Sequence, residues 1–330
     1  MFQLKKATKI LAGTAIGSAA VLGTFCTVAY ECMLNIDVSR IIGEKFGSQP
    51  EPPAPPTEET EPAPAPPANL FGEAMAKWHS EHTAEDIFLI NEKGQKRHAK
   101  LFDNGHPEKW AIIFHGYTSG PEGMYHYAYA YGAMGFNLIL PSMIGHAQDE
   151  NRYCSMGYHD RYMGLDWINY VVSTHPDAEI ALHGESMGAA TTMLITGEKL
   201  PKNVKCAVED CGFTTCMEEY MHVAKTQISP QLAPLLPVIS FYSEMRGNFN
   251  FKKCAPIDAV KNSVTPTLFV HGEADDFVPF PMMARVFDAC AAEKEFFTVP
   301  GAGHAESATR DPKFYWTNVY NFVKKHITLW

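Results

Sequence analysis

The sequence predicts an α/β fold in which a mostly parallel sheet of eight strands carries helices on both faces. Three observations lead to this prediction. Strand-like apolar runs alternate with longer helix-like segments from about residue 70 to the C-terminus. The middle and later runs are continuously apolar, which is typical of strands buried on both faces of a parallel sheet. One of these runs leads directly into a turn of small residues and a helix, in the stretch "LHGESMGAA" at residues 182–190.

The elements follow one another in a regular order. The predicted strands are residues 85–90, 96–102, 110–116, 136–141, 178–184, 204–210, 265–272 and 295–301. The predicted helices lie between most of them, at residues 122–134, 157–174, 187–199, 280–292 and 312–326. This alternation predicts a doubly wound sheet. No internal repeat interrupts it, so we expect one globular domain at residues 70–330.

Composition narrows the class of protein. The chain has 330 residues, of which 46% are hydrophobic and 19% are charged, enough apolar material for one large core. Its net charge of -10 makes nucleic acid an unsuitable partner, because binding phosphates needs a basic surface. The eight cysteines include no C-x-x-C pair, so neither a zinc ribbon nor a thioredoxin-type motif is indicated. Free buried thiols and disulfides both remain open.

Residues 1–31 have the pattern of a membrane anchor. Three lysines among the first nine residues precede an uncharged run at residues 10–30, which as a helix matches the thickness of a bilayer core. Because Glu31 follows the run, the positive-inside rule keeps the N-terminus in the cytoplasm and places the rest of the chain outside. The alternative is a cleaved signal peptide and a secreted protein, since residues 27–29 form a weak cleavage site.

Residues 32–69 are predicted to be a juxtamembrane segment and a linker. Most of the linker is the stretch "QPEPPAPPTEETEPAPAPP" at residues 49–67. It has almost no apolar bulk, and proline withholds backbone donors, so it cannot form a packed core. We expect it to separate the anchor from the globular domain.

The stretch at residues 182–190 has the form G-x-S-x-G, with Ser186 between Gly184 and Gly188. A strand-to-helix turn this sharp requires the two glycines, because larger side chains would collide there. The turn raises the serine above the end of the sheet. The N-terminus of the following helix then lies beside the reacting oxygen and favours negative charge. Ser186 is therefore a candidate nucleophile.

A serine hydroxyl needs a neighbouring base, so the hypothesis requires an acid and a histidine after later strands. Asp275 and Asp276 follow the seventh predicted strand, and His304 follows the eighth. The order serine, acid, histidine is the one this kind of sheet uses. All these residues fall at carboxyl ends of strands, where an open α/β sheet gathers its site.

Three motifs together carry a resemblance to a known family: "HGESMG" at residues 183–188, "HGEADDFVP" at residues 271–279 and "GAGH" at residues 301–304. They resemble the nucleophile turn, acid loop and histidine loop of the α/β-hydrolase superfamily of serine hydrolases. The resemblance covers about residues 82–328. It is closest to the short-lid group of esterases, lipases and serine aminopeptidase-like proteins, here of a membrane-anchored bacterial type. The acid of that family's loop lies four residues after the histidine, which selects Asp275 over Asp276.

The resemblance also implies the remaining parts of the site. The oxyanion would be held by two backbone N–H groups, those of Met187 and Tyr117. Residues 212–262 lie where this fold inserts a lid. The chain departs from the family pattern D-x-R-G-H-G-x-S, because Ser142 and Ile144 replace the Asp and Arg. That loop is structural in the family, so the departure does not affect the predicted triad.

The sequence therefore predicts a serine hydrolase that cleaves carboxylic esters through an acyl-enzyme, using Ser186, His304 and Asp275. We expect no cofactor and no catalytic metal, because H-x-x-x-H, H-E-x-x-H and Gly-rich phosphate motifs are all missing from the sequence. The expected partners are a small ester or acyl substrate and the membrane; the oligomeric state is not indicated.

Two other functions remain open. One is a serine exopeptidase of the aminopeptidase type, in which Glu218 and Glu219 of the lid meet the free amino end of a peptide. The other is a catalytically inactive binding protein, because a fold by itself does not determine function.

Overall fold

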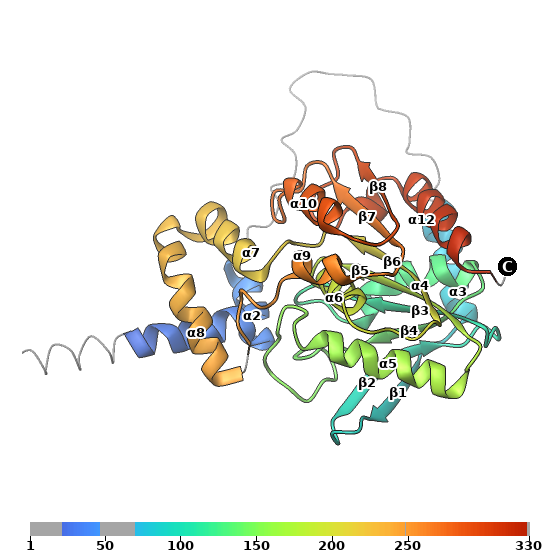
Figure 1. Ribbon diagram of the computed structural model, residues 1–330, viewed down its shortest axis with the longest axis horizontal. Coiled ribbons are helices and arrows are strands. Elements are labelled where there is room, and N and C mark those ends of the chain that lie inside the picture. The colour runs from blue at the N-terminus through green and yellow to red at the C-terminus, as the bar shows by residue number, and fades with distance from the viewer. Residues whose placement is uncertain (1–21, 47–69, 248, 329–330) are drawn as a thin grey trace, which may run out of the picture.

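A computed structural model describes residues 22–46, 70–247 and 249–328, which contain one eight-stranded sheet (Figure 1). Its strands lie in the order β1-β2-β4-β3-β5-β6-β7-β8. The pairs β1–β2 and β2–β4 are antiparallel, whereas the pairs from β4 through β8 are parallel. The strand bounds are β1 Glu85–Ile90, β2 Lys96–Phe102, β3 Lys109–Phe114, β4 Asn137–Pro141, β5 Glu179–Glu185, β6 Val204–Asp210, β7 Thr267–Gly272 and β8 Lys294–Val299. The predicted fold class is confirmed.

Helices cover both faces of the sheet, and alternate residues of β3 show how. Ile112 and Phe114 belong to the core shared with helices α5 and α6, whereas Ala111 and Ile113 belong to the core shared with α3, α4 and α12. All four side chains are fully buried. A central strand buried on both faces has to be apolar throughout, which is the pattern that predicted it. The helix bounds are α3 Leu70–Glu81, α4 Tyr125–Ala133, α5 Asp160–Thr174, α6 Met187–Thr196, α10 Pro281–Ala289, α11 Ser307–Arg310 and α12 Pro312–His326.

The predicted helices differ from the observed ones mainly at their ends. The segment predicted as one helix at residues 122–134 is a short 3-10 helix, η1 (Pro121–Met124), followed by α4. The first turn of the segment predicted at residues 157–174 is a loop, and α5 begins at Asp160. In that loop Gly157 has φ 96°, a backbone conformation that an α-helix excludes.

The lid at residues 212–262 consists of helices joined by short turns. It contains α7 (Cys216–Val223), a π-helical turn η2 (Ala224–Ile228), the 3-10 helix η3 (Pro230–Leu235), α8 (Leu236–Gly247), α9 (Pro256–Ala259) and the 3-10 helix η4 (Val260–Asn262). Figure 1 shows α7 and α8 projecting beside the sheet, next to α2 (Ile36–Phe46). Thr215 caps α7 by accepting a hydrogen bond from the Glu218 amide.

The segment at residues 22–46 packs against the hydrolase core, which the sequence analysis did not anticipate. Residues 22–34 are helical, and α2 follows them. Tyr30, Leu34 and Ile36 are buried in the same apolar cluster as α5 and α6. The Cys154 amide donates to the Leu34 carbonyl at 2.9 Å, which ties the segment to the loop after β4. Residues that had been assigned to a juxtamembrane segment thus form part of the folded domain.

The predicted anchor falls only partly within the structure. Residues 1–21 lie outside the described residues, as does the proline-rich stretch at residues 49–67. Residues 22–30 belong to the helix that packs against the lid and the core. Among the helices that the structure describes, we find none with the length and apolarity needed to cross a membrane.

The tightest backbone packing in the fold lies where β5 turns into α6. A Cβ atom added to Gly188 would lie 2.0 Å from the Phe114 carbonyl oxygen of β3, and one added to Gly184 would lie 2.1 Å from the Gly188 oxygen. Real Cβ atoms do not approach backbone atoms this closely. The two glycines therefore allow α6 to begin directly against β3 and β5.

We expect Gly188→Ala to destabilise the fold, because the added methyl group meets backbone that cannot move aside. Overpacking of this kind costs about 1–3 kcal/mol or more, which in a domain of this size lowers Tm by about 2–4 °C per kcal/mol. Thermal unfolding of the purified protein checks this. The matched control is Gly23→Ala, where an added Cβ meets nothing within 4 Å. Equal Tm values for the two variants would contradict the packing argument.

Candidate active site

The structure brings together the three residues of the predicted triad. The Ser186 Oγ lies 2.8 Å from His304 Nε2, and His304 Nδ1 lies 2.8 Å from Asp275 Oδ2. Because a carboxylate accepts, Nδ1 carries the ring proton, and Nε2 is left to accept the proton of the serine hydroxyl. Ser186 follows β5, Asp275 follows β7 and His304 follows β8, so parallel strands deliver all three to one edge of the sheet.

Asp275 is held ionised by its hydrogen bonds. Its Oδ1 accepts the amides of Phe277 and Val278, at 3.0 and 2.9 Å. Its Oδ2 faces Nε2 of His271 at 3.3 Å as well as the His304 ring. Burial raises the pKa of this carboxyl group, but the contacts with His271 and His304 outweigh burial and hold the pKa at about 2. The contact of His271 with Asp275 makes this histidine a positioning residue.

Asp276, the other acid considered for the triad, lies outside this network. Its side chain is exposed. Its backbone carbonyl oxygen lies 2.8 Å from His222 Nε2. The structure therefore separates two adjacent acids that the chain order alone left equivalent.

Ser186 sits in a strained turn. Its φ of 55° and ψ of -114° are rare for a residue with a side chain, and such a conformation costs on the order of 1–3 kcal/mol. The strain persists because the close backbone contacts at Gly184 and Gly188 fix the course of the chain through this turn. Ser186 precedes the first turn of α6, so the unpaired amides of that turn face the reacting oxygen.

Tyr117 and Met187, the predicted oxyanion donors, flank this turn. Met187 is the first residue of α6. A Cβ built on Gly116 would lie 3.6 Å from the Ser186 Cβ, which places the loop after β3 beside the nucleophile. Within the part of the chain that the structure describes, neither the Tyr117 amide nor the Met187 amide has a recorded hydrogen-bond partner. Both amides are available to an oxyanion.

The N-terminal segment holds the side chain of Tyr117. The Tyr117 hydroxyl lies 2.8 Å from the Met33 carbonyl and 2.7 Å from the Ser39 hydroxyl, either of which can accept its proton. Ser39 Oγ in turn donates to the Cys32 carbonyl at 2.8 Å. No local sequence signal indicates this contact, because its partners are about 80 residues apart. It connects residues 22–46 to the loop that carries an oxyanion donor.

Two buried histidines also support that loop. Nε2 of His146 accepts the Thr118 amide at 3.2 Å, and Thr118 has a positive φ of 58°. Nε2 of His115 accepts the Met143 amide at 3.2 Å. Burial lowers the pKa of His146 to about 3 and that of His115 to about 4, so both rings are neutral and able to accept. They are structural rather than reacting groups.

The departure from the family pattern also has a structural explanation. Ser142 stands where relatives have Asp, and its hydroxyl bonds His98 Nδ1 at 2.7 Å. The Ile144 amide donates to the buried carboxylate of Asp160 at 2.7 Å. The loop is thus fixed by contacts of its own.

Burial raises the pKa of two other acids under the site. Burial raises the pKa of Glu185 to about 7, and the nearby charge of Asp210 raises it further, although Tyr127 donates to this carboxylate at 3.0 Å. Burial likewise raises the pKa of Glu209 to about 8, and among the described residues the Gly212 amide is its one donor. The carboxylate of Asp275 is thus distinguished from its neighbours by the number of its hydrogen-bond donors.

Among the described residues, one group offers metal-type ligands: Cys211, Asp275 and His304, with one ligand atom each within 4.8 Å of the others. Asp275 and His304 already bond to each other. Burial raises the pKa of the Cys211 thiol well above its usual range, whereas a zinc site needs the thiolate. The arrangement is that of a triad with a neighbouring thiol rather than a metal site. All eight cysteines are free, two of them in the N-terminal helix and six after residue 70.

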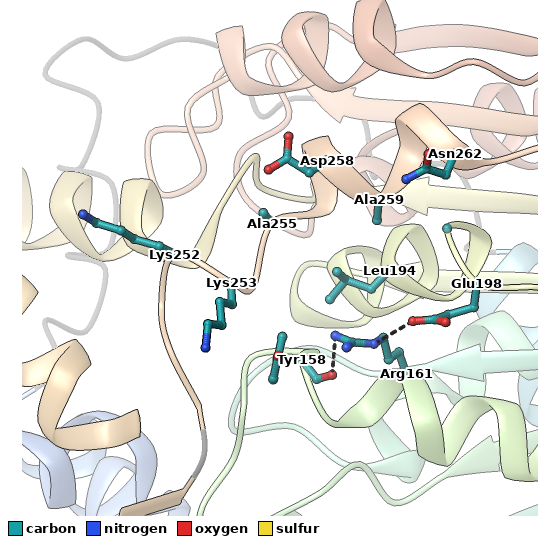
Figure 2. Close-up of a pocket in the computed structure, with 11 residues that line it drawn as sticks. Tyr158, Arg161, Leu194, Glu198, Lys252, Lys253, Ala255, Asp258, Ala259 and Asn262 are labelled. Atoms are coloured by element: carbon teal, nitrogen blue, oxygen red, sulfur yellow. Dashed lines mark hydrogen bonds and ion pairs between the residues drawn. The ribbon is translucent and has the colours of Figure 1, made fainter. Parts of the chain in front are cut away.

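A separate cavity of about 520 Å³ opens beside α6 and α9, away from the triad (Figure 2). Arg161 crosses it and is held by Glu198 at 2.9 Å and by the Tyr158 carbonyl at 2.8 Å. Because no triad residue lines it, this cavity plays no part in the arrangement around Ser186.

The two lid acids lie in different surroundings. Glu218 forms an ion pair with Arg285 of α10 at 3.1 Å and accepts from Thr214. Glu219 is 2% exposed, and neither of its carboxylate oxygens has a hydrogen-bond partner among the described residues. Burial, and secondarily the charge of Asp275, raises the pKa of Glu219 to about 8. Of the two, only Glu219 is a candidate to contact a ligand near the triad.

Comparison with protein families places the chain. A family model described as the prolyl oligopeptidase family matches residues 151–329, more than half of the chain and all three triad residues. The chain belongs to this family. It is a serine hydrolase. The family match bears out the expected superfamily, although the sequence motifs had pointed within it to the esterase, lipase and aminopeptidase-like group.

The similar curated proteins are distant and mostly without assigned function. The chain is 26% identical over 217 residues to the uncharacterized protein YqkD of Bacillus subtilis, covering 64% of this chain and 70% of that one. It is 22% identical over 194 residues to the protein bem46 of Schizosaccharomyces pombe, covering 56% and 57% of the two chains. More than two fifths of bem46 therefore has no counterpart in the match.

Solved structures support the fold. An esterase of Pyrococcus furiosus, Pf2001, aligns with a TM-score of 0.61 at 19% identity, covering 75% of this chain and 94% of the esterase. An acylaminoacyl peptidase of Pyrococcus horikoshii aligns with a TM-score of 0.56 at 16% identity, covering 74% of this chain and 42% of the peptidase. At these identities the likeness concerns the fold alone, and it includes both ester and peptide hydrolases.

We expect Tyr117→Phe to lower kcat about tenfold and to leave KM nearly unchanged. The variant keeps the ring and the backbone N–H but loses the hydroxyl contacts with Met33 and Ser39. We therefore expect the backbone N–H of residue 117 to be displaced but not lost. Outright loss of an oxyanion donor costs about 10²–10³-fold. Steady-state kinetics on a short p-nitrophenyl ester measures the effect.

The matched control is Tyr242→Phe. It removes a hydroxyl that contacts the same N-terminal helix through Thr27, but from the lid rather than from the oxyanion loop. Its kcat should stay near that of the wild type. A normal kcat in Tyr117→Phe, with only a lower Tm, would mean that the hydroxyl serves stability alone.

We expect Glu209→Gln to stabilise the protein at high pH. The folded-state pKa of about 8 lies above the usual carboxyl value, so the folded state binds the extra proton and stability falls as pH rises through that interval. The amide removes this dependence. The Tm advantage of the variant should therefore grow between pH 5 and pH 9, by about 2–4 °C per kcal/mol.

Differential scanning fluorimetry across this pH range measures the advantage. The exposed Glu92→Gln serves as the control and should show a constant difference from wild type. A constant difference for Glu209→Gln as well would contradict the assigned protonation.

Proposed function

We propose that the protein hydrolyses carboxylic esters through an acyl-enzyme. His304 Nε2 takes the Ser186 proton as Oγ attacks the ester carbonyl, and Asp275 stabilises the imidazolium that forms. The amides of Tyr117 and Met187 hold the tetrahedral oxyanion. His304 then gives its proton to the leaving alcohol. Water, deprotonated by the same ring, attacks the acyl carbon and releases the acid and free Ser186.

The observation that carries the proposal is a pair of 2.8 Å hydrogen bonds, which connect Ser186 Oγ to the His304 ring and that ring to the Asp275 carboxylate. Two further features favour an ester with an apolar acyl group. The Phe277 ring lies against the His304 ring, with centroids 4.8 Å apart. The lid is rich in apolar side chains, and Leu236 and Ile239 of α8 are buried against the domain.

The second candidate is an exopeptidase, and Glu219 favours it. A buried carboxyl group without a hydrogen-bond partner is unfavourable, and a ligand can supply the partner. A cationic amino group placed between Glu219 and the triad would do so. Such a substrate would also lower the pKa of Glu219, which in the free protein is about 8.

We also propose that residues 1–31 anchor the protein in the cell membrane with the catalytic domain outside the cytoplasm. The support is the sequence pattern of three lysines followed by an uncharged run, of which residues 22–30 pack against the lid and the core. A catalytically inactive binding protein on the same fold is the remaining alternative, and the aligned triad argues against it.

Replacing triad residues should abolish turnover of a short p-nitrophenyl ester. Ser186→Ala should also lose labelling by a fluorophosphonate probe, which reacts with activated serines. Asp275→Asn should reduce kcat on the order of 10³–10⁴-fold, because the histidine then loses its orienting acceptor. The matched control, Asp276→Asn, should retain near-normal kcat. Absence of labelling in the folded wild type would favour the binding protein.

Ester and peptide hydrolysis are separated by a substrate comparison. We expect the wild type to turn over short acyl p-nitrophenyl esters faster than aminoacyl p-nitroanilides at equal concentration. Faster amide turnover that is lost in Glu219→Gln, while ester turnover is kept, would overturn the esterase assignment and establish the exopeptidase.

A further inference from the structure

Exposed apolar side chains are concentrated on the lid and on the N-terminal segment. Of the thirteen large apolar side chains that are exposed in the described part of the chain, seven lie within residues 22–46 and 224–247. These two segments make up a small part of the protein. Large apolar side chains gathered in one region of a surface usually mark a contact with another apolar body.

Helix α8 is apolar on two opposite faces. Leu236, Ile239 and Ser243 are buried against the domain. Val238, Phe241 and Met245 are 37%, 60% and 63% exposed, and their spacing of three and four residues places them together on the other side. We call these three residues the outer face of α8. A helix with apolar side chains on two opposite faces is suited to contact with an apolar body on its outer side.

The outer face belongs to a helix that lies beside the incoming chain. The Thr27 hydroxyl is 2.7 Å from the Tyr242 hydroxyl, and the Tyr30 and Tyr242 rings meet edge to face with centroids 5.9 Å apart. Arg246 lies over the Tyr30 ring at 5.4 Å. The helix at residues 22–34 adds two exposed apolar side chains of its own, Leu22 and Val28. Figure 1 shows α8 next to this helix, at the end of the molecule where the described chain begins.

The sequence that leads into this helix indicates what covers the outer face. The residues immediately before Leu22 belong to the uncharged run that begins at residue 10, after three lysines. A run of this kind partitions into the hydrocarbon of a bilayer, with the lysines at its anionic surface. Because α8 contacts the helix that continues this run, any bilayer that takes up the run comes close to α8.

We propose that the outer face of α8, with Leu22 and Val28, docks onto the surface of a lipid bilayer and holds the lid against the membrane. The proposal extends the anchoring proposed above to a second, lid-borne contact. It implies that the lid side of the active site faces the membrane, so that an ester carried in the bilayer is nearer to Ser186 than one in solution. Long-chain acyl esters are the substrate class that this arrangement suits.

The test uses the full chain in vesicles of phosphatidylcholine and phosphatidylglycerol whose acyl chains carry bromine, which quenches tryptophan on contact. The variant Phe241→Trp places a reporter on the outer face, and wild-type fluorescence gives the background. The matched control is Phe296→Trp, since Phe296 is 56% exposed on β8, far from the lid in the sheet order. We expect quenching of Phe241→Trp at least twofold above background and none for Phe296→Trp.

Equal quenching of the two reporters, or none, overturns the proposal. Dimerisation in detergent together with an unquenched Phe241→Trp overturns it in favour of a second copy of the chain on this face. Flotation of the wild type with the vesicles reports on the anchor separately: a chain that floats but leaves Phe241→Trp unquenched is anchored without docking, and a chain that does not float overturns both.

Activity supplies an independent readout. Phe241→Asp should lose at least tenfold in turnover of a long-chain ester embedded in vesicles, since transferring a phenylalanine side chain into an apolar environment is worth about tenfold or more. It should keep wild-type turnover of a short soluble ester, which verifies the fold and the triad. Equal losses on both substrates would assign Phe241 to the stability of the lid and overturn docking.

Discussion

The structure depends on one close approach of backbone, where α6 begins against β3 and β5. Gly184 and Gly188 leave no room for a methyl group, and this contact holds Ser186 at a positive φ that an ordinary turn would relax. The strain places Oγ above the carboxyl edge of the sheet and the start of α6 beneath it. Asp275 and His304 can reach Ser186 there, because they follow β7 and β8, which end at the same edge of the sheet.

The pKa values of the acids at that edge depend on the number of their hydrogen-bond donors as well as on burial. Asp275, Glu185 and Glu209 are all largely removed from water, yet only Asp275 keeps a low pKa. Among the described residues, two amides and two imidazoles point at Asp275, whereas a single group donates to each of the others. Asp275 is therefore ionised at a lower pH than Glu185 and Glu209. This localises the negative charge beside His304, where it stabilises an imidazolium.

The N-terminal segment links parts of the protein that the motifs describe separately. Residues 22–46 contact the oxyanion loop through Tyr117, the loop after β4 through Cys154 and the lid through Tyr242. A chain trimmed at residue 70 would keep the triad residues but lose these contacts. The segment thus couples the position of an oxyanion donor to the position of the lid, and both to the chain that enters from the N-terminus.

The sequence by itself determined the succession of strands along the chain, the turn around Ser186 and the identities of the three triad residues. These are encoded in short stretches, where apolar runs and glycine spacing act locally. The family resemblance had already selected Asp275 over Asp276, but only the tertiary structure decided that Glu218 is paired while Glu219 is not, and that residues 22–46 belong to the domain. Each of these depends on contacts between segments far apart in the chain, such as Tyr117 with Met33, and local pattern carries no information about which distant surfaces meet.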